Sequence, residues 1–162
     1  MRSFRLGKNS HHESSKYRCV MEAVACVAGE PHSDRPKCAS EAITILAIDI
    51  NDACDWRFRQ KWLGEMPWRI AGTNSQEHEQ RRWAMMNKLL ADAAEAYNFA
   101  AHYPSYSQDF RDFHMALKCA TAEGRRNEFL RWATDVLDKM INLTEIKEAV
   151  PVKQPELAAV TA

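Results

Sequence analysis

This sequence has few glycines, no net charge and no long apolar run. The 162 residues include five glycines, and 22 basic residues balance 22 acidic ones. A net charge of zero excludes a global electrostatic attraction to nucleic acid or to an anionic membrane. The longest uncharged apolar run, AITILAI, is far shorter than the ~20 residues that a membrane-spanning helix needs. The first basic residues are followed by the polar stretch NSHHESSK, so we expect no secretory signal and a cytoplasmic protein.

Signatures of catalysis and metal binding are also missing. The sequence contains no G-x-S-x-G elbow, no H-E-x-x-H pair and no glycine-rich phosphate loop. Its five cysteines have no regular spacing, which indicates reduced thiols rather than a disulfide framework. Cys19 and Cys26 stand about 10 Å apart along a predicted helix, too far for both to bind one zinc ion. We therefore expect no metal and no cofactor, and an enzyme is the less favoured class.

The spacing of apolar residues predicts an all-α fold, a compact bundle of about five or six helices in orthogonal packing. The first helix is expected at about 16–28, capped by Ser14 or Ser15 and ended by Gly29. A second helix is expected after Ser40, in an isoleucine-rich run that also favours a β-strand. This run lacks strict period-two alternation, so helix is the preferred interpretation.

Further helices are expected in the second half of the chain. Asn74 and Glu77 have the spacing of a capping box and should open the longest helix. Ser107 is expected to cap the helix after it, with Phe110 on the buried face. The predicted limits are about 74–103, 107–123 and 126–143, after a short irregular segment at 55–72.

Composition divides the chain into three parts. Residues 1–15 are rich in basic side chains and are expected to form a flexible, solvated arm. Residues 16–148 carry the helical pattern and are expected to form one domain. Residues 149–162 hold two prolines without periodicity, which predicts a loose C-terminal tail.

The loop VAGEPHSDRPKC, residues 27–38, gathers acidic, hydroxyl, imidazole and basic groups directly after an apolar run. One interpretation is structural, because Ser and Asp side chains accept backbone N–H bonds in turns and Arg neutralises a carboxylate. The other is a catalytic or ligand-binding loop, although catalytic triads usually combine residues from separate parts of a chain. The candidate residues of this loop and of the helix before it are Glu22, Glu30, Ser33, Asp34, Arg35 and Cys38.

The segment DWRFRQKWLGEMPWR, residues 55–69, alternates aromatic and basic side chains. Tryptophan is enriched at protein interfaces, so Trp56, Phe58, Trp62 and Trp68 are the predicted partner contacts. The same alternation is found in stacking platforms for single-stranded nucleic acid. In that alternative, Arg57, Arg59 and Lys61 would act together with the basic arm. The small excess of cations in the segment favours the protein contact, because it gives little counterion release.

The string CVMEAVACVAGEPHSDRPKCASEAI, followed by NDACD and later IAGT, resembles an uncharacterised family of small helical proteins from actinobacteria and their phages. The resemblance covers about the first half of the chain and implies no particular chemistry. His32 stands where relatives carry tryptophan or phenylalanine, which argues against His32 as a ligand or base. The resemblance directs attention instead to Glu22, Glu30, Asp34 and Cys38, which either fasten the first two helices together or line a pocket.

These observations favour a non-enzymatic cytoplasmic protein that acts by binding another protein or a second copy of itself. The resemblance also admits a phage-encoded protein. Two alternatives stay open at this point. One is a small enzyme or ligand-binding protein that uses the loop from Glu30 to Cys38, and the other is a nucleic-acid-binding protein.

Overall fold

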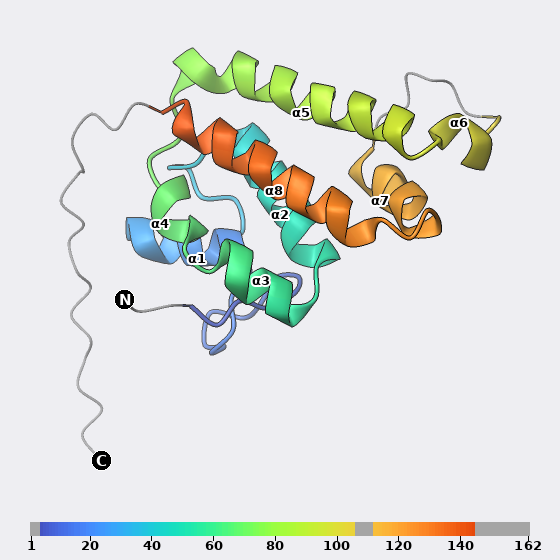
Figure 1. Cartoon of the computed structure of the whole chain (residues 1–162). Coiled ribbons are helices and arrows are strands. Elements are labelled where there is room, and N and C mark those ends of the chain that lie inside the picture. Colours follow the sequence, from blue (N-terminus) through green and yellow to red (C-terminus); the bar gives the residue numbers. More distant parts are fainter. Residues whose placement is uncertain (1–3, 106–111, 145–162) are drawn as a thin grey trace.

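The computed structural model describes residues 4–105 and 112–144, and these residues form eight helices and no β-strand. The all-α fold predicted from the sequence is confirmed. The helices are α1 (Val20–Ala28), α2 (Glu41–Ala53), α3 (Trp56–Leu63), α4 (Met66–Ile70), α5 (Gln76–Ala96), α6 (Phe99–His102), α7 (Phe113–Ala122) and α8 (Arg126–Asn142). Figure 1 shows their arrangement.

Helix α8 packs against three other helices of the bundle. It contacts α2, α5 and α7, while α1 packs against α2 and α4. In Figure 1, α1 and α4 lie at one end of the molecule and α6 and α7 at the other. The apolar faces of these helices form one connected core that excludes water. Its largest fully buried apolar side chains include Leu46, Ile50, Leu89, Phe129 and Leu137.

Two helix ends lie where local sequence signals placed them. Gly29 has φ 69°, and its N–H donates to the carbonyls at the end of α1. This left-handed conformation suits glycine, which has no Cβ. Ser40 caps α2, because its hydroxyl accepts the Ile43 N–H at 3.2 Å. The helix interpretation of the isoleucine-rich run is therefore confirmed.

The start of α1 differs from the prediction. Cys19, rather than Ser14 or Ser15, is the N-cap, and its sulfur accepts the Glu22 N–H at 3.3 Å. The Glu22 carboxylate in turn accepts the Cys19 N–H at 2.7 Å. This reciprocal pair is a capping box in which cysteine replaces the usual serine or threonine. The two serines belong to the loop before the helix.

The long helix predicted near 74–103 is in fact two helices. Helix α5 begins at Gln76 after Ser75, which makes no side-chain cap bond, so the capping box of Asn74 and Glu77 is absent. At its other end, Asn98 adopts a left-handed conformation with φ 53° and separates α5 from α6. Tyr97, just before this break, is fully buried and packs edge-on against Phe129.

The segment 55–72, predicted to be irregular, contains α3 and α4. Asp55 caps α3 by accepting the Phe58 N–H at 2.8 Å. Pro67 lies in the first turn of α4, where its missing N–H costs no intrahelical bond. Helix α7 is capped by Asp112. The predicted cap Ser107, the predicted core residue Phe110 and the C-terminal tail at 149–162 lie outside the described residues.

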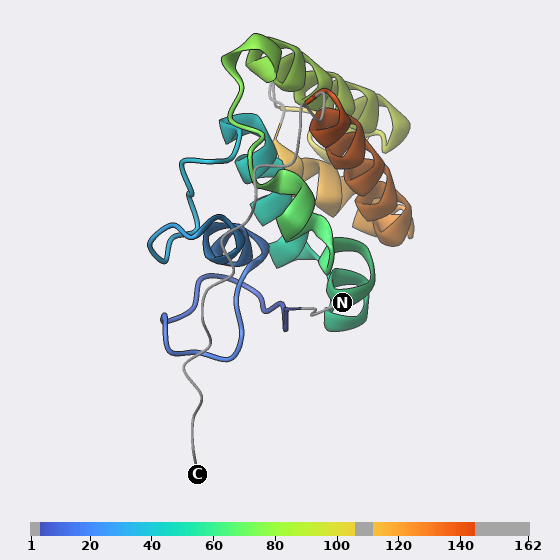
Figure 2. The same ribbon diagram turned by 90° about the vertical axis from the view of Figure 1, so that its left-hand side faces the viewer.

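Residues 4–19, called the N-terminal loop below, pack against the helices, which differs from the flexible arm expected at 1–15. Leu6 is fully buried, and an isolated β-bridge pairs it with Arg18. The Gln60 amide joins this loop to α3 by accepting the Leu6 N–H and donating to the Phe4 carbonyl. Figure 2 shows the loop, in dark blue, below α1 with its first described residues next to α3. Long-range contacts that the local sequence does not encode therefore hold this segment.

None of the helices in the described part of the chain is long and apolar enough to cross a bilayer.

Candidate interaction surface

The Glu30 carboxylate, in the loop predicted as a site, binds the backbone. Both Glu30 oxygens accept N–H groups, from Lys37 at 2.7 Å and from Cys38 at 2.8 Å. The Ser33 hydroxyl accepts the Arg35 N–H at 2.9 Å, which is a turn bond of the serine type. These bonds close the loop on itself and direct the Glu30 oxygens toward the backbone.

The other candidates of this loop do not converge on a pocket. Asp34 and Arg35 are exposed, and no ion pair within the described residues engages either of them. Cys38 is partly buried, and this burial raises the pKa of its thiol. In the described part of the chain, no three His, Cys, Asp or Glu side chains are placed to hold a metal ion.

Glu22 is the hub that joins α1 to the N-terminal loop. Its side chain is 2% exposed, and it accepts the backbone N–H groups of Cys19 and His11, the latter at 2.6 Å. Nδ1 of His11 lies 3.3 Å from one carboxylate oxygen, and Nε2 of His32 lies 3.5 Å from the other. A buried carboxylate needs such donors because its water has been removed.

The partners of His32 determine its tautomer. Nε2 lies 2.7 Å from the His11 carbonyl, which only accepts hydrogen bonds, so Nε2 carries the proton. Nδ1 lies 2.9 Å from the Arg18 guanidinium, which only donates, so Nδ1 accepts. His32 therefore bridges the N-terminal loop to the loop after α1, which is a structural role.

Burial makes the capping cysteine unsuited to thiol chemistry. Cys19 is 3% exposed, and burial raises the pKa of its thiol to about 12, with the nearby Glu22 carboxylate adding to the rise. Thiolate is the nucleophilic form of cysteine, so this sulfur stays protonated and acts as a hydrogen-bond acceptor in the cap.

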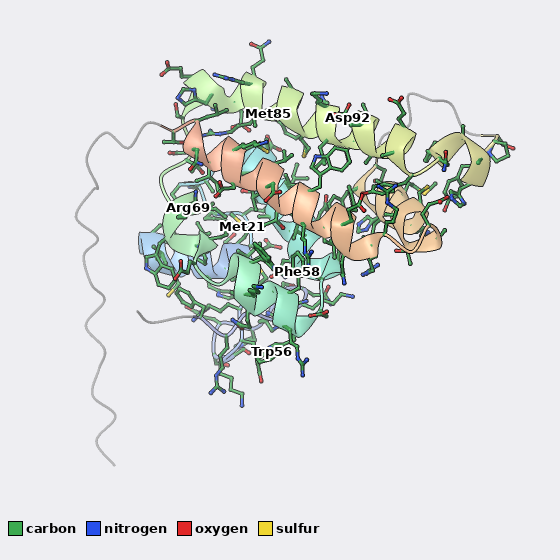
Figure 3. All side chains as sticks on the ribbon, in the orientation of Figure 1. Met21, Trp56, Phe58, Arg69, Met85 and Asp92 are labelled. Carbon is green, nitrogen blue, oxygen red and sulfur yellow. The ribbon has the colours of Figure 1, made fainter. Side chains whose placement is uncertain are left out.

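Exposed aromatic side chains gather where the N-terminal loop meets α3. These side chains surround a hollow, which we call the aromatic groove. It has a volume of about 470 Å³ and is lined by Phe4, Arg5, Tyr17, Trp56 and Gln60. Trp56 is 60% exposed and Tyr17 is 37% exposed. In Figure 3, Trp56 lies at the lower edge of the molecule and Phe58 lies closer to α8.

Helix α4 extends this surface through one ring contact. Trp68 is 42% exposed, and its ring centroid lies 5.1 Å from that of Phe4. The rings are tilted by 36°, within the range of favourable aromatic contacts. Trp56 and Trp68, two of the predicted partner contacts, are therefore joined by Phe4 and bracket one continuous surface.

The other two predicted contacts lie elsewhere. Trp62 lines a second hollow of about 270 Å³ between α3, α4 and α8, together with Glu65, Arg69 and Asp135. Phe58 is half-buried, packs on the core and lies 5.9 Å from the Trp62 ring. The four aromatic residues predicted as one contact are thus divided between two sides of α3, because Trp56 and Trp62 are six positions apart on a helix.

The position of Arg59 contradicts the role predicted for it in the nucleic-acid alternative. Its side chain is 5% exposed, and its guanidinium donates to the carbonyls of Asn51 and Cys54 at the end of α2. It caps a helix C-terminus, where carbonyl groups lack intrahelical partners, and is unavailable to a phosphate. Arg57 and Lys61 are exposed, with the Lys61 ammonium 5.0 Å from the Trp62 ring centroid.

Sequence reasoning did not find Phe4, Tyr17 and Gln60 as parts of this surface. Phe4 and Tyr17 are separated from Trp56 by long stretches of chain, and no pattern in the sequence singles out Gln60. The local signals were Phe4 and Leu6, two large apolar residues within an arm rich in basic and polar side chains, which indicate an anchoring point for the loop.

Asp49 is the carboxyl group of α2 that meets the start of α7. Burial raises its pKa to about 6, although the neighbouring His114, 3.9 Å away, opposes the rise. The folded state therefore binds this proton more tightly than the unfolded chain, whose ordinary value is 3.8. Asp49 consequently lowers the stability of the fold as the pH rises from about 4 to above 6.

We expect Asp49→Asn to raise the free energy of unfolding by about 1–2 kcal/mol at neutral pH and to change it little near pH 4. This gain in the free energy of unfolding is smaller than the full pKa shift would give, because the side chain is still 25% exposed and water screens its charge. Urea denaturation of the wild-type protein and the variant at a series of pH values measures the change in the free energy of unfolding at neutral pH and near pH 4. Asp34→Asn, at an exposed position, is the control and should show no such pH-dependent gain. An equal gain at pH 4 and pH 7 would contradict this explanation.

Comparison with protein-family models, curated proteins and solved structures finds no match. The family resemblance drawn from the sequence therefore stays a prediction.

Proposed function

We propose that this protein is a non-enzymatic binding protein and that it contacts a protein partner through the aromatic groove and the adjoining Trp68. The observation that carries the proposal is the exposure of Trp56, 60% of whose surface is open to water. Contiguous exposed apolar surface is uncommon on monomers and marks interaction sites. Tryptophan and tyrosine supply large contact areas with few rotatable bonds, and they dominate interface energies.

The geometry of the loop after α1 supports this function over a loop-centred enzyme or ligand-binding protein. A catalytic carboxylate must reach substrate, whereas Glu22 and Glu30 accept backbone N–H bonds. The two hollows described above lie at α3 rather than at this loop. A second copy of the chain is one candidate partner, because isologous dimers use such apolar patches.

We expect Trp56→Ala and Trp68→Ala each to weaken partner binding by about 2 kcal/mol or more, roughly thirtyfold in Kd, while the helical content stays unchanged. Fold retention follows from exposure, since neither ring is part of the closed core. Self-association is measured by sedimentation over a concentration series. Binding to partners recovered by affinity capture is measured by calorimetry.

Trp62→Ala is the matched control for this test, since Trp62 is exposed to about the same degree as Trp68 but lines the second hollow. It should leave binding unchanged if the groove is the contact. Equal losses for Trp62 and Trp56 would move the contact to both sides of α3. Unchanged sedimentation and unchanged capture in the Trp56 and Trp68 variants would remove the proposal.

A further inference from the structure

Charged side chains are distributed unevenly over the molecule. Cations are in excess on the two segments that form the aromatic groove, the N-terminal loop and α3. The N-terminal loop and residues 55–64 together carry seven Lys and Arg residues against two acidic ones, in a chain of zero net charge. Arg18 and Arg59 are used internally. The other five cations are exposed: Arg5, Lys8, Lys16, Arg57 and Lys61.

Arg5 is the cation that lines the groove itself. Its side chain is exposed, and no hydrogen bond or ion pair within the described residues engages its guanidinium. The Lys16 ammonium lies 5.5 Å from the centroid of the Tyr17 ring, which lines the same groove. The amide of Gln60, on the groove wall, is used by the backbone of Phe4 and Leu6. The groove thus offers aromatic faces and an unpaired positive charge, with its amide group already occupied.

We infer that the segment recognised by the aromatic groove is acidic, with an apolar or aromatic anchor residue flanked by carboxylates. This inference rests on the proposed function and adds the chemistry of the partner. The anchor enters between Tyr17 and Trp56, and a neighbouring carboxylate pairs with Arg5 in the bidentate geometry that guanidinium prefers. The outer cations attract the rest of the segment and raise its association rate. A volume of about 470 Å³ lies within the ~300–1,000 Å³ range of ligand sites.

A single strand of nucleic acid is less well matched to the same surface. Its phosphates repeat at every nucleotide and need a continuous track of cations, whereas one arginine lines this groove. The Asp55 carboxylate caps α3 directly beside Trp56. Beyond the other end of α3, the second hollow presents Glu65, Asp135 and Asp138. A uniformly charged strand that extended from the groove along α3 would meet these carboxylates.

The test is a selection of random 12-residue peptides on the full chain, run in parallel on its Trp56→Ala variant. Peptides that bind only when Trp56 is present are expected to carry net negative charge and at least one Trp, Phe or Leu. One such peptide is then synthesised and titrated. Arg5→Glu should raise its Kd by about tenfold or more, while Arg81→Glu, an exposed arginine on α5, should leave it unchanged. Added salt should weaken binding.

The outcomes separate this inference from the proposed function. If Trp56-dependent peptides are neutral or basic, or if Arg5→Glu does not weaken binding, the acidic partner is wrong and the binding surface stands. If selection yields no Trp56-dependent peptide, both fail. A twelve-residue oligothymidine that binds through Trp56 more tightly than the selected peptide, with a steep salt dependence, would make the partner a nucleic acid and would overturn both.

Discussion

Arg82→Ala is expected to lower the free energy of unfolding by about 3–5 kcal/mol, the largest loss from any single substitution considered for this protein. Arg82 has no exposed surface, and its guanidinium donates to the carbonyls of Thr73 at 2.6 Å and Met140 at 3.1 Å. It also bonds the Thr144 hydroxyl and lies 3.6 Å from the Glu79 carboxylate. This one side chain joins α5 to the segment before it and to the C-terminal end of α8.

The expected loss has two parts. The carbonyls at the end of α8 have no intrahelical partner, so truncation leaves buried acceptors unsatisfied at about 1–3 kcal/mol for each group. The Glu79 carboxylate, 17% exposed, also loses its nearest cation. Burial lowers the pKa of Arg82, which shows that removing its water has a cost that only these partners offset.

Arg81→Ala is the control, because Arg81 is the adjacent residue of α5 and is exposed. It should change stability by no more than about 0.5 kcal/mol. Arg82→Lys should lose an intermediate amount of stability. The planar guanidinium of arginine donates to several acceptors at once, whereas the single ammonium group of lysine cannot reach all four partners. Urea denaturation followed by circular dichroism gives all three values. Equal stabilities for the Arg81 and Arg82 variants would refute the role assigned to this guanidinium.

The second large effect is expected at Glu22. Glu22→Ala should cost about 2–4 kcal/mol, because it removes the capping box of α1 and leaves the His11 and Cys19 N–H groups without their acceptor. The N-terminal loop should loosen at the same time. Amide hydrogen exchange should therefore become faster at His11 and Cys19, and less so in α8.

Glu41→Ala is the matched control, since Glu41 also lies in the first turn of a helix but is exposed. Its loss should stay within the few tenths of a kcal/mol that a surface carboxylate contributes near a helix N-terminus. Glu22→Gln keeps one acceptor oxygen and should fall between them. If exchange at the His11 amide is unchanged in Glu22→Ala, the carboxylate does not hold the loop.

The helices were predictable where the signal lies within a few residues. Ser40 and Gly29 act on backbone groups in their own turn, so the sequence alone indicates them. The break at Asn98 was missed because apolar spacing continues across it. Directly before that break, Tyr97 packs against Phe129, more than thirty residues away, and a local pattern does not contain this contact.

The interaction surface was predictable in part for the same reason. An aromatic excess in the segment 55–69 placed Trp56 on the surface, but it could not separate Trp56 from Trp62. It also assigned Arg59 to solvent, whereas the open end of α2 draws this guanidinium inward. The position of Phe4 in this surface depends on a long-range hydrogen bond. The Gln60 amide donates to the Phe4 carbonyl, and the two residues stand 56 positions apart in the sequence.

That bond has a consequence for synthesis on the ribosome. Leu6 leaves the ribosome first, yet the side chain that fixes it comes 54 residues later. At about 5–20 residues per second, Leu6 waits roughly 3–11 s before this partner emerges. During this interval an apolar residue that is later fully buried stays available to chaperones. The N-terminal loop thus reaches its final position only after α3 has been synthesised.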